Sequence, residues 1–165
     1  MSNYFELQKP KPTIGFWITT GAKIGLLAGA ITANLFILLV TVQDNISTGN
    51  IDVYDIVLPY IVLGQLFGTV PAILVGLVCG MFMGFVFYHL DKINWLASGG
   101  SEGLITTIGL ILLLSLACSW LEPDLIVELR KSFSLLQIFE VLFLFAAAGV
   151  WSGKQLVQHK RIRNV

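Results

Sequence analysis

The sequence is poor in charge. Asp, Glu, Lys and Arg make up 12% of its 165 residues, whereas 56% are hydrophobic, and the mean hydropathy is +0.83. Soluble globular domains carry about 25% charged residues, so this composition excludes an ordinary soluble domain and predicts a protein that lies in a lipid bilayer. The 10 basic and 10 acidic residues cancel. No net field therefore favours nucleic acid, and membrane lipid is the first expected partner.

Patterns that carry chemistry are missing as well. The sequence has no metal-ligand spacing of Cys, His, Asp or Glu, no Gly-x-Ser-x-Gly turn, no phosphate-binding loop and no HExxH. Its two cysteines, Cys79 and Cys118, fall at different predicted membrane depths, which argues against a disulfide between them. An enzyme needs a convergent set of acids, bases or metal ligands. We therefore expect no catalytic residue, no metal and no cofactor.

Four long apolar runs are present instead. They cover residues 14–42, 56–88, 104–120 and 133–151. A helix that spans the hydrocarbon core needs about 20 apolar residues, and backbone polar groups in lipid must pair internally, so the runs predict transmembrane helices rather than alternating barrel strands. The expected fold is all-α and polytopic. A four-helix transmembrane domain at 14–154 would lie between an N-terminal tail at 1–13 and a basic C-terminal tail at 155–165.

Basic residues are divided unevenly between the two sides of these helices. Seven of them lie in the tails or in the loop after the second run: Lys9, Lys11, Lys92, Lys154, Lys160, Arg161 and Arg163. The loop at 43–55 has no Lys or Arg and carries three aspartates. Because Lys and Arg mark the cytoplasmic side, we expect a multi-pass protein with both termini in the cytoplasm.

Small residues recur at every fourth position in the first two runs. The first run has Gly21, Gly25, Gly29 and Ala33. The second run has Gly64, Gly68, Ala72, Gly76, Gly80 and Gly84. Helices in lipid associate where small residues let their backbones approach, so we expect the first two helices to pack closely, at a right-handed crossing of about −40°. Two uses of the stripes stay open: packing inside the chain, or docking onto another chain, either a second copy or a different membrane protein.

The second run contains Pro71 and is longer than a bilayer requires. A straight helix over 56–88 would measure about 50 Å, against a hydrocarbon core of about 30 Å. Pro71 has no backbone N–H, which leaves the carbonyl of Phe67 without its helical donor. The sequence therefore predicts a long second helix that is kinked or broken at a hinge formed by Gly68 and Pro71. Many transporters surround a solute with helices broken in this way.

Four polar residues lie inside the apolar runs at a similar predicted depth: Asn34, Gln65, Gln137 and Glu140. Polar groups in lipid are costly and by default indicate a functional site. We expect them to form one intramembrane polar cluster in the outer half of the bundle. Glu140 would either bind a proton or cation there, or be hydrogen-bonded to Asn34 or Gln65 and so hold the helices together.

The stretch YIVLGQLFGTVPAILVGLVCGMFMG has the pattern Tyr60-x3-Gly64-x6-Pro71-Ala72-x3-Gly76. It resembles a pattern of uncharacterised small four-helix proteins of the bacterial inner membrane. The resemblance implies a small membrane protein of the bacterial cytoplasmic membrane with no assigned activity. The portion from Gly68 to Ala72 is also similar to solute-binding subunits of vitamin transporters, which usually have six helices.

These features lead to two functional hypotheses. The first is a non-enzymatic integral membrane protein that acts as a structural, assembly or immunity-type partner through its glycine-lined helix face. The alternative is a small transporter or channel subunit that uses the break near Pro71 and the carboxyl group of Glu140.

Overall fold

The computed structural model describes residues 11–48, 64, 68–121 and 135–164. Its four helices are α1 (Ile14–Thr48), α3 (Val70–Lys92), α4 (Gly100–Leu121) and α6 (Leu135–Asn164). Each contains a segment that is long and apolar enough to cross a membrane. The predicted all-α fold with four transmembrane helices is confirmed, and the chain is a multi-pass membrane protein.

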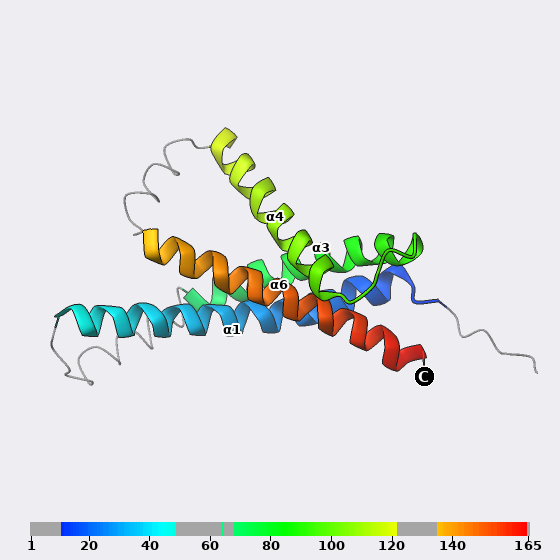
Figure 1. Ribbon diagram of the computed structural model, residues 1–165, viewed down its shortest axis with the longest axis horizontal. Helices are drawn as coiled ribbons and strands as arrows, with labels where there is room; N and C mark the ends of the chain where they lie inside the picture. The colour runs from blue at the N-terminus through cyan, green and yellow to red at the C-terminus, as the bar shows by residue number, and fades with distance from the viewer. Residues whose placement is uncertain (1–10, 49–63, 65–67, 122–134, 165) are drawn as a thin grey trace, which may run out of the picture.

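The helices form two pairs (Figure 1). In one pair, α1 and α3 run side by side along most of their length, and in the other, α4 leaves α6 after a short contact. The pairs meet mainly where α6 lies across α1. The backbones of α4 and α1 do not come close anywhere in the described part of the chain. The start of α1 and the end of α6 lie at the same end of the molecule, which we name the terminal end; the opposite end is the far end.

The core of buried side chains lies at the terminal end. Trp17, Phe87 and Leu156 are fully buried and come from α1, α3 and α6, respectively. Ile24, Met83 and Val157 join them in one cluster. Residues 155–164, predicted as a basic tail, are helical and supply two members of this core. Lys160 pairs with Asp91 in the same region and ties the end of α6 to the end of α3.

The first turn of α3 contains Pro71. A proline is tolerated there because the first N–H groups of a helix have no intrahelical acceptor. Gly68 and Thr69, directly before α3, form a wider π-helical turn. Residues 56–63 and 65–67 lie outside the described residues, so the predicted long, kinked second helix stays a prediction in that detail.

A short turn at 93–99 connects α3 to α4 and fixes where α4 begins. Gly99 has a φ of 82°, a left-handed conformation that favours glycine. Glu102 then accepts hydrogen bonds from the backbone N–H groups of Ala97 (2.7 Å) and Ser98 (3.3 Å). These bonds hold the turn against the first turn of α4 and so fix where α4 begins.

Candidate functional site

The glycine stripes of α1 and α3 face each other. Gly25 packs on Gly76 and Gly80: a Cβ atom built on Gly25 would lie 2.6 Å from the Cα atom of Gly80, and one built on Gly80 would lie 2.8 Å from the Cα atom of Gly25. Since real Cβ atoms essentially never come within 3.0 Å of such atoms, no other residue fits at either position without moving a backbone. We name this contact the first crossing.

The first crossing extends in both directions along the two helices. Gly21 lies against Gly80 and Gly84, and Gly29 lies against Ala72 and Gly76. Toward the terminal end, Gly84 packs on the backbone of Trp17 and Ile18. Toward the far end, Ala33 is buried, and both Gly64 and Gly68 face the side chain of Ile37. Both predicted stripes are thus placed inside the chain, one against the other.

A second glycine contact joins α4 to α6, and the sequence analysis missed it. A Cβ atom on Gly103 would lie 3.0 Å from the Cα atom of Gly153, and one on Gly149 would lie 2.8 Å from the Cβ atom of Thr107. Gly99 lies against Gly153 in the same way. We name this contact the second crossing. The sequence does contain a pattern that indicates this contact. Gly99 and Gly103, and also Gly149 and Gly153, have the same spacing of four as the stripes of the first two runs.

The second crossing is short because large residues follow it on both helices. One turn beyond Thr107 the stripe of α4 continues with Ile111, and one turn before Gly149 the stripe of α6 has Phe145. Side chains of this size do not let two helix backbones approach as closely as glycines do. Every residue from 112 to 117 of α4 is exposed, and α4 points away from the other helices at its far end (Figure 1).

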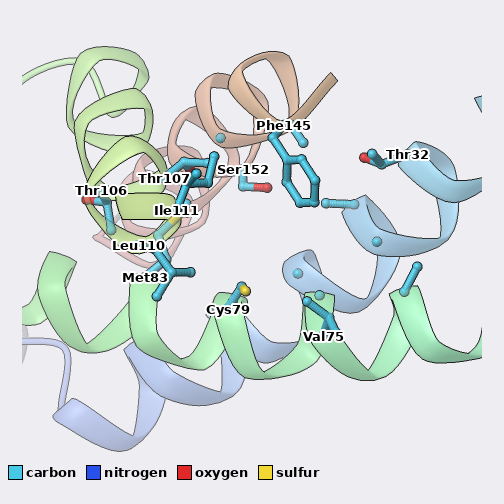
Figure 2. A pocket seen from close by; sticks show the side chains of 18 of the residues that line it. Thr32, Val75, Cys79, Met83, Thr106, Thr107, Leu110, Ile111, Phe145 and Ser152 are labelled. Carbon is cyan, nitrogen blue, oxygen red and sulfur yellow. The ribbon is translucent and has the colours of Figure 1, made fainter. Parts of the chain in front are cut away.

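The divergence of α4 leaves a cleft of about 680 Å³ that all four helices line. Its floor is the side of the first crossing formed by Gly21, Gly25, Gly29, Ala72, Gly76 and Gly80. Its walls include Cys79 and Met83 from α3, Leu110 and Ile111 from α4, and Phe145 from α6, as Figure 2 shows. More than half of the lining residues are Gly, Ala, Ser, Thr or Cys, and none carries a charge.

The four polar residues predicted to form one intramembrane cluster are only partly described, so the cluster stays a prediction. Glu140 accepts a hydrogen bond through Oε1 from the side-chain amide of Gln43, a residue that the sequence analysis did not single out. The side-chain amide of Asn34 donates to the carbonyl of Ala30 in its own helix (2.8 Å). Gln137 is half-buried on α6, one turn before Glu140, and Gln65 lies outside the described residues.

The Gln43–Glu140 hydrogen bond links the two helix pairs at the far end. Oε2 of Glu140 is buried and has no hydrogen-bond partner among the described residues. The two ends of the α1–α6 contact therefore differ in chemistry. At the terminal end apolar side chains pack together around Trp17 and Leu156, and at the far end one polar pair joins the helices.

No group of three or more His, Cys, Asp or Glu residues comes together in the described part of the chain. Cys79 is a free thiol on a wall of the cleft (Figure 2). The side chains that line the cleft are a thiol, hydroxyls and apolar groups.

No protein-family model, no curated protein sequence and no solved structure matches this chain. The resemblance of the stretch around Pro71 to small four-helix inner-membrane proteins stays a prediction.

Proposed function

We propose that this chain is a non-enzymatic membrane partner protein, of a structural, assembly or immunity type, and that its cleft docks a transmembrane helix of another membrane chain. The observation that carries the proposal is the cleft: a glycine-floored, uncharged groove of about 680 Å³ to which all four helices contribute. The glycine-lined face expected from the sequence has two roles in this proposal. It packs α1 on α3, and one side of it forms the floor of the groove.

The shape of the cleft suits one face of a helix. It is partly open rather than an enclosed cavity, and all four helices line it. A groove of this kind receives one face of a helix laid into it.

The residue types of the cleft also suit a helix. Membrane helix interfaces are enriched in Gly, Ala, Ser and Thr, because small residues let backbones approach. The floor offers six small residues, and hydroxyl residues such as Thr32, Thr107 and Ser152 add to the walls. An uncharged groove also imposes no cost of burying an unpaired charge.

The second candidate function is a small transporter or channel subunit, and Glu140 is the observation that favours it. Its buried, unpartnered Oε2 is a position at which a proton or small cation would compensate a carboxylate in lipid. This candidate predicts that Glu140→Gln abolishes flux in vesicles at an unchanged protein level, whereas the docking proposal predicts that it leaves partner binding intact.

We also place the chain in the bacterial cytoplasmic membrane with both termini in the cytoplasm. The position of Lys154, Lys160 and Arg161 at the terminal end supports this orientation, because basic residues are retained on the cytoplasmic side. A phosphatase that works only outside the cytoplasm, fused after Val165, should be inactive. Activity of that fusion would reverse the orientation.

The docking proposal is tested by the accessibility of Cys79 in native membranes. In a Cys118→Ser background, Cys79 is the only thiol. A lipid-soluble maleimide should modify it at least about tenfold more slowly in native membranes than after the complex is dissociated in strong detergent, because the reagent reaches only molecules whose cleft is empty.

The matched control is Val78→Cys with Cys79→Ser and Cys118→Ser. Val78 is the neighbouring residue, at the same depth, but it is 59% exposed and lies outside the cleft lining. Its labelling should be the same before and after dissociation. Two results together would contradict the proposal: Cys79 is labelled equally fast in native membranes and in strong detergent, and no second chain copurifies with the native protein.

A further inference from the structure

The turn between α3 and α4, at the terminal end (Figure 1), exposes two large apolar side chains. Trp95 is 74% exposed and Ile93 is 57% exposed, whereas Leu96 in the same turn packs against the buried core. The backbone N–H groups of Ile93 and Trp95 donate to the carbonyls of His89 (3.2 Å) and Leu90 (2.9 Å). Because these bonds and Leu96 anchor the turn, its two exposed apolar side chains are held at fixed positions on the surface.

The lengths of the adjoining helices place this turn at the level of the lipid headgroups. α3 ends at Lys92 and has 23 residues, which is about 35 Å of helix, and the hydrocarbon core is about 30 Å thick. The next membrane-spanning helix, α4, begins at Gly100. The turn therefore lies where one helix leaves the hydrocarbon core and the next one enters it, which is the level at which tryptophan is enriched in membrane proteins.

Two exposed lysines flank the turn. Lys92 directly precedes it. The side chain of Lys154 packs on Gly100, directly after it, since a Cβ atom built on Gly100 would lie 3.1 Å from Cε of Lys154. Both lysine side chains are exposed, and neither forms an ion pair within the described part of the chain. Positive charge thus lies at both ends of the apolar surface formed by Ile93 and Trp95.

The acidic residues near the turn are engaged in contacts of their own. Asp91 pairs with Lys160 of α6. The carboxylate of Glu102 accepts hydrogen bonds from two backbone N–H groups of the turn and from the hydroxyl of Ser101 (2.9 Å). These carboxylates are therefore bound inside the protein, and the charges of Lys92 and Lys154 are left to an anion from outside the described chain.

We propose that the α3–α4 turn binds anionic phospholipid, with Ile93 and Trp95 seated between lipid molecules and Lys92 and Lys154 beside the phosphate groups. Basic residues next to the end of a membrane helix are attracted to anionic headgroups, and an exposed tryptophan supplies both apolar surface and an N–H donor at this level. None of these four residues lines the cleft, so the inference goes beyond the docking function and does not depend on what fills the cleft.

The test compares two lipids that differ only in the headgroup. The protein in a mild detergent is titrated with phosphatidylglycerol, or with phosphatidylcholine that has the same acyl chains, and native mass spectrometry gives the fraction of protein with bound lipid. We expect phosphatidylglycerol to bind at least about fivefold more tightly, because one basic residue near an anionic surface contributes about that factor. High salt should reduce this ratio. Binding of an acyl chain in the cleft would be the same for both lipids and would not change it.

Variants then locate the preference on the turn. Lys92→Gln and Lys154→Gln should each lower the ratio at least about twofold, and the double variant at least about fourfold. Trp95→Ala should weaken the binding of both lipids and leave the ratio unchanged, because it removes apolar contact and no charge.

The matched control is Lys23→Gln. Lys23 is also an exposed lysine, but its neighbours Gly21 and Gly25 both pack on Gly80. It therefore lies near the level of Gly80, which is twelve residues, or about 18 Å of helix, before Lys92. Removing its charge should leave the ratio unchanged.

Three results would each overturn the proposal. Equal binding of the two lipids by the original chain would leave the turn to a soluble partner. An effect of Lys23→Gln as large as that of Lys154→Gln would make the total charge of the chain, rather than the turn, responsible for the preference. Unchanged lipid binding by Trp95→Ala would exclude the apolar contact. The labelling of Cys79 tests the docking function separately, so either proposal can fail while the other holds.

Discussion

Both crossings pack two helices through small residues at a spacing of four, but over different lengths of helix. In the first, small residues repeat from Gly21 to Ala33 on α1 and from Gly68 to Gly84 on and just before α3, and α1 and α3 stay together throughout. In the second, the repeat ends after Thr107 on α4 and before Gly149 on α6, and the helices diverge. The number of small residues in register therefore determines how far two membrane helices remain in contact, and the cleft exists because one register is short.

The largest expected effect comes from breaking the first crossing. Gly80→Leu would place a side chain against the backbone of Gly21 and Gly25, where neither helix has room to yield. We expect a loss of about 3 kcal/mol or more in stability, measured by unfolding in mixed micelles of increasing SDS content. Gly109→Leu is the matched control, because a side chain at that position meets open space within the chain. Equal losses for the two variants would contradict the tight packing of α1 on α3.

Breaking the second crossing should have a smaller and more local effect. Gly153→Leu would drive a side chain into Gly99 and Gly103, so α4 should separate from α6 while α1 and α3 remain packed. We expect about 2 kcal/mol of destabilisation and faster hydrogen exchange in α4 than in α3. A uniform rise in exchange over all four helices would mean that the two crossings are not independent.

Extending the second crossing should close the cleft. Phe145→Ala together with Ile111→Ala continues the small-residue register by one turn on each helix, so α4 should approach α6. Cross-linking between cysteines placed at Leu116 and Phe139 should rise, and the thiol of Cys79 should become less accessible. Leu113→Ala with Phe143→Ala changes apolar residues outside the cleft lining and should leave both quantities unchanged.

The smallest expected effect concerns the polar pair that joins the two helix pairs. Glu140→Gln retains a carbonyl oxygen that accepts from the amide of Gln43, so its stability should stay near that of the original chain. Glu140→Leu leaves this amide without its acceptor, and we expect a loss of about 1 kcal/mol, as hydrogen bonds between membrane helices contribute little. A loss as large as that of Gly80→Leu would make the polar pair, rather than the crossings, the main support of the bundle.

Much of this architecture follows from the sequence. Apolar length predicts the four helices, because a continuous apolar run pairs its backbone groups in lipid as a helix, whereas a barrel would need alternating strands. The spacing of four predicts the stripes that meet in the first crossing. The same spacing at Gly99, Gly103, Gly149 and Gly153 would have predicted the second crossing. These glycines lie at the ends of the apolar runs, however, where a glycine indicates a helix end or a turn equally well.

The polar pair, the cleft and the buried core depend on how the helices cross in three dimensions. The pairing of Glu140 with Gln43 requires α6 to cross α1 near its far end, and residue spacing contains no information on that angle. The cleft is harder still to predict, since it is the space that remains where α4 and α6 diverge beyond the second crossing. The core around Trp17 also draws on residues 156 and 157, which their basic neighbours had indicated to be part of a tail.

If α4 leaves α6 because the second register of small residues is short, the two helices lie farther apart at the far end than beside the second crossing, and spin-label distances measure this difference. One doubly labelled chain carries cysteines at Leu116 and Phe139, at the far end; a second carries them at Ile105 and Trp151, beside the crossing. Both are measured in lipid discs with an excess of unlabelled chain, so that distances between copies do not contribute. We expect a clearly longer distance at the far end than beside the second crossing. Equal distances would mean that α4 packs along α6 throughout, and the cleft would not exist.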